Sequence, residues 1–516
     1  SYANMQESYA SWITNLVNQS VFTWMLGFNP ASALINMVQT PGVSLPVMAG
    51  RHQMGQSSRV LSKAYRDFFT GKDPSGETGI YSNLKDDGER KMFAALTDNG
   101  LFDRTRSHDL AGLSDEGIAR GTLWRTFMLG STWAFHKAEV ANREVTALAA
   151  YRLEFAKTGS VKQAIEYADK IVRDTHLDYS SANRPDLFQG NFARIMTQFK
   201  MYSQGMTYLW GKTFYDAFFS KAKSAEQKAE AKKVFYSLVG IQTATAGAMG
   251  LPIGGILLAA EAIAAMFDDD DEPVDVEIEI RKALSSLLGE TGGRVVARGP
   301  LSELTGLDFH SRLSLADLWI REPDRELEGK DKAYYLMKTA FGPSGGLLED
   351  ILTGLKMVEE GNTERGLEKM LPRFISGAVK GLRMAEEGGA TALSGEMLHE
   401  MNAWEKIAQG LGMRSAGLAE RQLQNSAIKN REAAVGETKA KLLHKAVNAK
   451  MKGDNEAFKE AMDDIKEFNA KYPDLRITPA SIMKSIKTRK KNKAITKDGL
   501  VVKPKYEFIR DEENFL

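Results

Sequence analysis

A stretch of 27 residues without a charged side chain, from Val234 to Ala260, constrains this chain more than any other feature. With Glu261 as its one charge, the apolar character continues to Phe267 and then stops at the acidic run Asp268–Glu272. The chain as a whole is ordinary in composition, with 26% charged residues. Since a helix that spans a bilayer needs about 20 apolar residues, length alone would permit a membrane segment here.

The middle of this stretch, GAMGLPIGG at residues 247–255, argues against one straight helix. Pro252 lacks a backbone donor, and the glycines around it loosen helical structure. The two remaining pieces of roughly fifteen residues are short for separate spans. Glu261 at bilayer depth would add a cost of about 3 kcal/mol. The sequence therefore predicts an apolar helix–break–helix element.

Three interpretations of this element remain open: a permanent membrane span, a hairpin buried in an assembled particle, and a segment that is buried first and inserted later. Its basic N-terminal flank and acidic C-terminal flank would orient an inserted segment with the basic side in the cytoplasm. The residues assigned to this membrane or buried-partner segment are Leu238, Ile241, Met249, Leu251, Pro252, Ile253, Ile256, Leu257, Leu258, Ile263, Met266 and Phe267.

Helix-start signals recur outside the apolar stretch. Ser160 and Gln163 have the spacing of a capping box, and the apolar residues that follow them recur at helical spacing. Thr478 followed by Pro479 is an N-cap with proline at the first helical position. Both patterns predict that a helix begins at the next residue.

Longer segments point the same way. Residues 110–157 predict one or two long helices, and residues 419–474 predict a helical hairpin that turns at Gly453-Asp454. The best strand candidate is GLVVKPKYEF at 499–508. We therefore expect an all-α fold, an elongated multi-helix assembly with long amphipathic helices.

Glycine, proline and acidic residues cluster at 268–273, 341–350 and 386–396, which marks these places as candidate boundaries. We expect four regions. They are an N-terminal helical region (1–233), the apolar element with its acidic end (234–272), a middle helical region (273–390), and a C-terminal helical hairpin with a basic tail (391–516).

A long amphipathic helix with an aromatic face is predicted from Phe192 onward, because apolar residues recur there every three or four positions. Aromatic side chains are enriched in protein interfaces, so we expect this face to form the seam of a homo-oligomer. The residues assigned to the seam are Phe192, Phe199, Tyr202, Met206, Leu209 and Trp210.

The sequence offers no arrangement of residues for catalysis. The chain has no cysteine, which excludes disulfides, thiolate zinc sites and a cysteine nucleophile. None of the seven histidines lies three to five residues from another, as a helical metal pair requires. The sequence also lacks a phosphate-binding loop, a dinucleotide fingerprint and a nucleophile elbow. We expect no catalytic residues, no metal, no cofactor and no enzymatic activity in this segment.

A formal net charge of +1 leaves any contact with nucleic acid to a local patch. The basic run at residues 484–497 is such a patch, suited to phosphate contact. No aromatic residue is interleaved with it, so base stacking is not supported. The candidate contacts are Lys484, Lys487, Arg489, Lys490, Lys491 and Lys493, with Lys497 extending the run.

Six blocks of sequence, taken in order, carry a resemblance to a known family. The first three are FNPASALINMVQTPGVSLP at 28–46, MTQFKMYSQGM at 196–206, and GLPIGG followed by FDDDDEPVD. The others are VARGPLSELTGLDFHSRLSLADLW at 296–319, FGPSGGLLEDILTGLKMVEEGNTERGLEKMLPRF at 341–374, and QNSAIKNRE at 424–432. Nearly all of the chain thus resembles the C-terminal region of the large polyvalent, PLxRFG-type internal virion (ejection) proteins of short-tailed phages.

The resemblance implies a location inside the virion at the portal vertex, and then in the host periplasm and inner membrane after ejection. It implies assembly with copies of the same chain, with other internal virion proteins and with portal and tail proteins. Phage DNA and the host inner membrane are further implied partners, since such proteins build a conduit for DNA delivery. The PLxRFG hexapeptide itself and the family's upstream enzymatic modules are missing from this sequence, so enzymatic activity is not carried over.

Two alternatives to the conduit function remain open. One is a virion scaffold that never contacts a membrane and docks an upstream enzymatic domain. The other is a DNA-binding virion protein that acts through residues 484–497.

Overall fold

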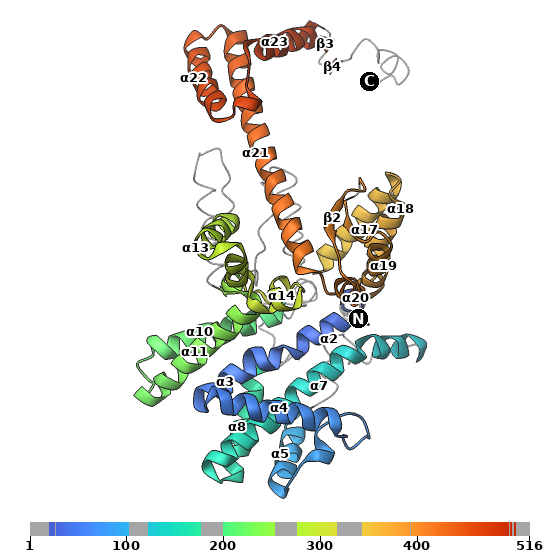
Figure 1. The fold of residues 1–516 in the computed structure, drawn as a ribbon, viewed down its shortest axis with the longest axis vertical. Coiled ribbons are helices and arrows are strands. Elements are labelled where there is room, and N and C mark those ends of the chain that lie inside the picture. Colours follow the sequence, from blue (N-terminus) through green and yellow to red (C-terminus); the bar gives the residue numbers. More distant parts are fainter. Residues whose placement is uncertain are drawn as a thin grey trace, which may run out of the picture. The chain divides into compact units, whose positions relative to one another are not determined.

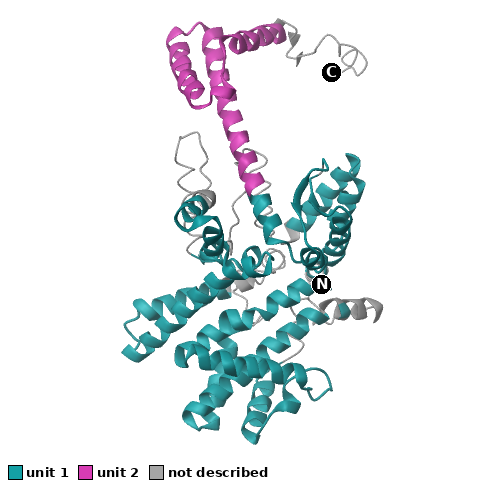
Figure 2. Cartoon of the chain, in the orientation of Figure 1, with its two compact units in different colours: residues 1–264, 276–423 teal, residues 265–275, 424–516 magenta. Residues whose placement is uncertain are grey.

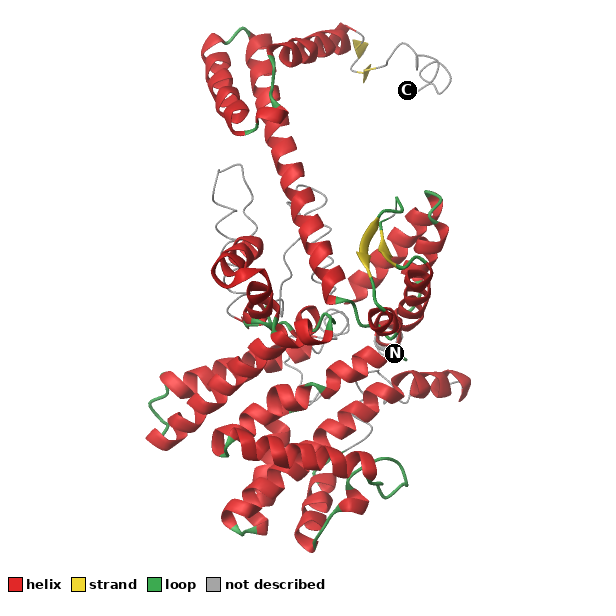
Figure 3. Cartoon of the chain, in the orientation of Figure 1, coloured by secondary structure: helices red, strands yellow, loops and turns green. Residues whose placement is uncertain are grey.

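The computed structural model describes residues 20–25, 27–102, 122–176, 200–252, 276–316, 343–392, 394–494, 496–497 and 500–501. The fold is all-α, as the sequence predicts, and Figure 3 shows how far helices dominate it. The chain forms two compact units, residues 1–264 with 276–423 and residues 265–275 with 424–516 (Figure 2). Each unit is described by itself.

The N-terminal part of the first unit consists of helices joined by short connections. They are α2 (Pro30–Met37), the π-helical turn η1 (Thr40–Ser44), α3 (Leu45–Arg51), α4 (Met54–Thr70), the 3-10 turn η2 (Tyr81–Asn83), α5 (Asp87–Asp98), α7 (Thr122–Thr158) and α8 (Val161–Thr175). Helix α7 falls in the segment predicted as long helix, although residues 103–121 lie outside the described part.

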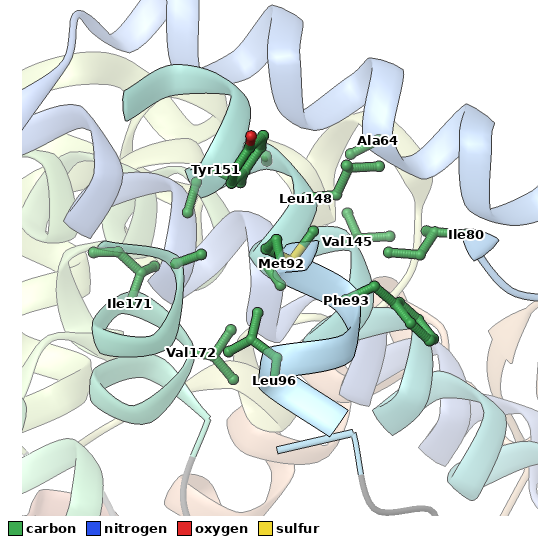
Figure 4. Close-up of a cluster of buried hydrophobic side chains, with 14 of the residues drawn as sticks. Ala64, Ile80, Met92, Phe93, Leu96, Val145, Leu148, Tyr151, Ile171 and Val172 are labelled. Atoms are coloured by element: carbon green, nitrogen blue, oxygen red, sulfur yellow. The ribbon is translucent and has the colours of Figure 1, made fainter. Parts of the chain in front are cut away.

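The core of this part surrounds α7, and Figure 4 draws it. Every residue of α7 from 141 to 150 is buried, because α2, α4, α5 and α8 all pack against this helix. Leu148 lies in the centre with Met92 of α5 and Ile171 of α8. A helix buried on all sides must satisfy its polar groups internally. Arg143 does so by donating to Glu139 at 3.0 Å.

Helix α8 begins where the sequence predicts. Ser160 is its N-cap, and the Ser160 hydroxyl accepts a hydrogen bond from the Gln163 backbone N–H at 3.4 Å. The reciprocal capping box occurs at two other helix starts, Ser224 with Gln227 and Asn402 with Glu405.

The remainder of the first unit contains a helical hairpin and several shorter helices. Its elements are α10 (Lys200–Phe218), α11 (Ala225–Ala246), the 3-10 turn η5 (Ala248–Gly250), α13 (Val276–Arg298), α14 (Pro300–Thr305), α15 (His310–Leu313), α17 (Pro343–Glu359), α18 (Thr363–Met370), α19 (Arg373–Glu386), β1 (Gly389–Thr391), β2 (Met397–Glu400) and α20 (Ala403–Gly410). Helix α21 (Ala416–Lys452) begins in the first unit, and its residues from 424 onward belong to the second.

The second unit contains the predicted helical hairpin, and its turn lies at Gly453-Asp454 as predicted. Helix α21 ends at Lys452, Gly453 adopts φ +77°, and the Asp454 side chain caps α22 (Asn455–Lys471) by accepting from the Ala457 N–H at 2.9 Å. The 3-10 turn η6 (Pro473–Leu475) connects α22 to α23 (Pro479–Ala494). Buried apolar residues of these three helices form a separate core.

Helix α23 begins at Pro479, as predicted. The hydroxyl of Thr478 accepts from the Ser481 N–H at 3.2 Å, and the Ser481 hydroxyl accepts in return from the Thr478 N–H at 3.1 Å. This serine takes the place of the glutamate or glutamine of an ordinary capping box.

Among the described residues, two pairs of short antiparallel strands interrupt the helices. Strand β1 pairs with β2, and β1 with the turn that follows it lies in the segment 386–396 that the sequence marks as a boundary. The residues of this turn give this segment the composition of a loop. Strand β3 (Thr496–Lys497) pairs with β4 (Leu500–Val501), so the predicted strand candidate contributes two described strand residues.

The units divide the chain differently from the four predicted regions. The predicted boundary at 233/234 lies within α11, and the one at 390/391 lies within the β1–β2 hairpin. The boundary at 272/273 lies outside the described residues.

Candidate functional site: the seat of the apolar helix

The first half of the apolar stretch is the C-terminal half of α11, which Figure 1 shows alongside α10. A capping box starts this helix: the Ser224 hydroxyl accepts from the Gln227 N–H at 3.2 Å, and the Gln227 side chain accepts from the Ser224 N–H at 3.0 Å. Charged and alanine residues fill its first turns, and apolar residues follow from Val234. One helix therefore joins the basic flank to the apolar stretch.

The predicted break is present, and it begins at Gly247. This residue ends α11 with φ +76°, a conformation that glycine adopts without strain. A side-chain Cβ at this position would lie 2.1 Å from the carbonyl oxygen of Ala297. Gly299 approaches from the end of α13 with φ +88°, and a Cβ there would lie 2.8 Å from the Gly247 nitrogen. The two helices can meet here only through glycine backbone.

Side chains and backbone groups from 310–315 hold the end of α11. The Gln242 amide donates to the carbonyl oxygens of Gly250 at 3.1 Å and Leu313 at 2.6 Å. The Leu315 N–H donates to the Gly250 oxygen at 2.9 Å, and His310 Nδ1 contacts the carbonyl oxygen of Ala246. These contacts satisfy carbonyls that a helix end otherwise leaves open. The residues Ala297, Gly299, His310, Leu313 and Leu315 are called the apolar-helix seat below.

The assigned membrane or buried-partner residues divide into three groups. Leu238 is 1% exposed and Met249 is also buried. The half-buried members are Ile241, Leu251 and Pro252. The members that lie outside the described residues are Ile253, Ile256, Leu257, Leu258, Ile263, Met266 and Phe267. The described half is thus packed against protein, which favours the two interpretations in which the element is buried over a permanent span.

No helix in the described ranges is both long enough and apolar enough to cross a membrane.

An ion pair anchors the seat to the start of α21. Asp308, 1% exposed, accepts from Arg414 Nη2 at 2.5 Å and Nε at 3.0 Å. Burial opposes ionisation of Asp308, but Arg414 and the Ser311 hydroxyl outweigh it and hold the pKa of this carboxyl below its usual value. Arg298, at the end of α13, donates to the Ala416 carbonyl oxygen at 3.0 Å. The segment 298–312 is therefore fixed at both ends.

The predicted oligomer-seam residues that the structure describes face inward. Met206 and Trp210 are buried and Leu209 is half-buried, and all three pack in a cluster that includes Val234 and Leu238 of α11. Tyr202 lies in α10, but its side chain is outside the described part, as are Phe192 and Phe199 entirely. The homo-oligomer itself stays a prediction.

The exposed aromatic residues of the α10–α11 hairpin are not among the residues predicted for the seam. They are Tyr208, Phe214, Tyr215, Phe218, Phe219 and Tyr236. The signal was present in the sequence as a dense aromatic run, YLWGKTFYDAFF at 208–219. A single amphipathic face cannot bury so many rings.

The predicted nucleic-acid contacts lie on α23. Ile482 and Ile486 face the core of the second unit, which leaves the lysines on the other faces. Arg489 is half-buried and donates to Asn448 of α21. The exposed members of the predicted set are Lys484, Lys487, Lys490, Lys491 and Lys493. Lys497 lies in β3.

One cluster has the residue types of a hydrolase triad. Ser415 Oγ donates to Glu405 Oε1 at 2.5 Å and lies 3.2 Å from His399 Nε2, which is itself 3.3 Å from the same Oε1. In a proton relay the serine and the acid use opposite ring nitrogens, whereas here both meet Nε2. Ser415 is also fully buried. The geometry is that of a buried turn beside the Asn402–Glu405 capping box.

No group of three or more His, Asp or Glu side chains is arranged to hold a metal ion anywhere in the described ranges.

Comparison of the chain with protein-family models, with curated proteins and with solved structures finds no match.

Proposed function

We propose that this chain is part of an internal virion (ejection) protein of a short-tailed phage. It assembles at the portal vertex with copies of itself and with other virion proteins, and helps to form the conduit through which DNA is delivered. The chain acts in this proposal by structure rather than by catalysis. The proposal comes from the six sequence blocks that carry the resemblance. The way these blocks pack together supports it.

The observation that carries the proposal is the contact between separate blocks of the resemblance. Val43, Met206 and Leu315 come from the blocks at 28–46, 196–206 and 296–319, and they share one buried cluster with α11. The Phe28 and Phe374 rings, from the first block and the block at 341–374, lie 5.1 Å apart. Blocks distant in sequence thus form one packed framework around the apolar helix.

The framework also suggests how an apolar segment can be carried in a particle. Leu238 and Met249 of this element are buried, and the apolar-helix seat holds the end of α11 through hydrogen bonds to Gln242 and Gly250. Each such contact contributes about 1 kcal/mol net. A few contacts of this size hold the end of α11 in its packed position and still allow it to be released. Release of this element would require the seat contacts to break.

The direct test is deletion of the coding sequence from the phage. The expected particles package DNA and adsorb to cells but deliver little DNA to the cytoplasm. Normal delivery by particles that lack the chain would refute the conduit role.

A specific observation favours DNA binding as a second candidate function. Residues 424–494 carry 17 Lys and Arg against nine Asp and Glu, a surplus of eight, whereas the whole chain has a surplus of one. Five lysines of α23 are exposed within this unit. A local positive surface of this kind attracts a phosphate backbone without reading its sequence.

A further inference from the structure

We infer that the end of the α10–α11 hairpin binds an anionic lipid surface without crossing it. The name aromatic tip is used for residues 208–236, which comprise most of α10, the connection 219–224 and the start of α11. The inference deepens the proposed function, because it assigns the membrane contact to this tip rather than to the apolar stretch. The inference rests on the proposed function only in naming the host inner membrane as the lipid surface.

The aromatic tip presents six aromatic side chains to solvent. Six of its aromatic side chains are between 39% and 66% exposed, although such residues are usually more buried. The Phe214 ring centroid lies 5.2 Å from that of Phe218 and 5.5 Å from that of Phe219. Phe235 lies beneath them, 5.5 Å from Phe214 and 5.8 Å from Phe218.

Within the described ranges, the packing of α11 on its neighbours stops short of this surface. Helix α11 packs on α3 at Gly50, where Val234 lies so close that a Cβ on Gly50 would be 2.2 Å from the Val234 side chain. Beyond that contact, toward the connection, every residue from 221 to 227 is exposed. The six exposed rings beside this polar connection form a cluster of exposed apolar side chains, a feature that marks an interaction site.

Lysines surround the rings. From residue 212 to residue 233 there are six lysines and three acidic residues, and Lys221 and Lys223 are the charges of the connection itself. The Lys232 ammonium lies 5.6 Å from the Phe218 ring centroid, and the Lys212 ammonium 5.5 Å from that of Tyr208. A lysine stem can lie along apolar surface while its charge stays at headgroup level. Clustered lysines of this kind attract anionic lipid.

The order of side chains fits the depth profile of a membrane interface. Phe218 and Phe219 lie at the end of α10, where they can enter the acyl boundary. Tyr208 and Tyr236 lie further from the connection, and tyrosine suits the headgroup level because its ring is apolar and its hydroxyl is polar. The connection presents exposed Lys221, Lys223 and Ser224, which fits contact with one leaflet surface.

Two other partners fit less well. Single-stranded nucleic acid needs free ring faces for base stacking, whereas Phe214, Phe218 and Phe235 are tilted or edge-on to one another. A second copy of the tip would bring the same lysines together, and like charges repel. An anionic lipid surface offers the opposite charge and an apolar layer behind it.

The test is flotation of the full chain with vesicles of phosphatidylcholine alone and of equimolar phosphatidylcholine and phosphatidylglycerol. The expected result is binding to the anionic vesicles that weakens with salt and is much lower on neutral ones. The triple variant Tyr215→Ser, Phe219→Ser, Tyr236→Ser removes exposed rings and should reduce partitioning about tenfold or more. Lys221→Glu with Lys223→Glu should remove the preference for phosphatidylglycerol.

A matched control changes exposed apolar residues elsewhere, Leu287→Ser, Leu304→Ser and Met483→Ser, and should bind as the parent does. Full binding by the triple ring variant would overturn the inference, as would equal binding to both vesicle types. So would competition by single-stranded DNA, or a self-association that the ring substitutions abolish. Flotation uses the purified chain and the deletion uses whole phage. A lack of vesicle binding would therefore refute only the lipid contact, and normal DNA delivery by the deletion particles would refute only the virion role.

Discussion

Gly247 and Gly299 meet backbone to backbone, so that a Cβ on Gly299 would lie 2.8 Å from the Gly247 nitrogen. Both residues have positive φ, and both end a helix, α11 in one case and α13 in the other. The contact fixes where the apolar helix stops. It also places the carbonyl groups of the last turn of α11 within reach of His310.

Gly247→Ala should therefore destabilise the apolar-helix seat. The substitution adds the strain of an L-residue at φ +76° and a clash with the Ala297 carbonyl, at a cost of about 2 kcal/mol or more. Hydrogen exchange should become faster at residues 238–252 and 310–316. The free energy of urea unfolding should fall by a similar amount.

Gly240→Ala on the same helix is the matched control. Gly240 is exposed and helical, and a Cβ there meets no atom within 4 Å. Alanine is the better helix former by about 0.5–1 kcal/mol, so this variant should be slightly more stable than the parent. Equal behaviour of the two variants would contradict the geometry of the break.

Arg152 neutralises two buried carboxylates. It donates to Asp67 at 2.5 Å and to Glu89 at 2.7 Å, and both acids are at least nine-tenths buried. Arg152→Met would remove the nearest cation from both acids, since Arg66 lies 3.9 Å from Asp67, and breaking a buried pair costs about 3–5 kcal/mol. Thermal unfolding of the first unit should report this loss.

Two comparison variants make that result specific. Arg173→Met breaks an exposed i,i+4 pair with Asp169 and should change stability by about 0.5 kcal/mol at most. Adding Asp67→Asn and Glu89→Gln to Arg152→Met should recover part of the loss. A lack of recovery would show that packing of the arginine, rather than its charge, matters.

His176 should make the first unit sensitive to acid. Complete burial, with a smaller effect of Arg143, lowers the pKa of this histidine to about 3. Its Nε2 lies 2.9 Å from Thr146 Oγ1 and 3.2 Å from Ser44 Oγ, in a polar pocket of the core. The unfolded chain takes up a proton near pH 6.5 that the folded chain does not, so stability falls as pH drops from about 6.5 toward 3.

The expected loss between pH 7 and pH 5 is about 2 kcal/mol in the free energy of unfolding. His176→Asn should be less stable at pH 7, because it fills the pocket poorly, but its free energy of unfolding should vary less with pH. An unchanged pH slope in the variant would show that other groups cause the acid sensitivity.

If α23 contacts DNA, its lysines should set the salt dependence of binding. Changing Lys484, Lys487, Lys490 and Lys491 to Gln removes four phosphate contacts and should reduce the slope of log affinity against log salt by about 3.6. Lys459→Gln with Lys466→Gln on α22 is the control, since these exposed lysines lie among acidic residues. An equal loss per lysine removed in the two variants would mean that total charge, and not α23, governs binding.

The sequence predicts much of the fold because its helix signals are local. Ser160, Gly453 and Pro479 each act within a few residues of a helix end, and each occurs where its pattern indicates. The break at Gly247–Pro252 is local in the same way. The β1–β2 hairpin was missed because its strands are short and its glycine-rich composition resembles a linker.

The candidate site depends on contacts that no local pattern contains. The seat joins Gln242 to Leu313 and Gly247 to Gly299, residues far apart in the chain. The aromatic residues of α10 show the same limit. Periodicity identifies Met206 and Trp210 as members of one face, but it does not tell whether that face meets another chain or, as here, α11 of the same chain.

The role in DNA delivery can be measured directly by quantitative mass spectrometry of purified phage particles before and after triggered DNA release. We expect several copies of this chain per intact particle, protected from protease, and a large loss of the chain from emptied particles. Absence of the chain from intact particles, or its full retention after release, would contradict it.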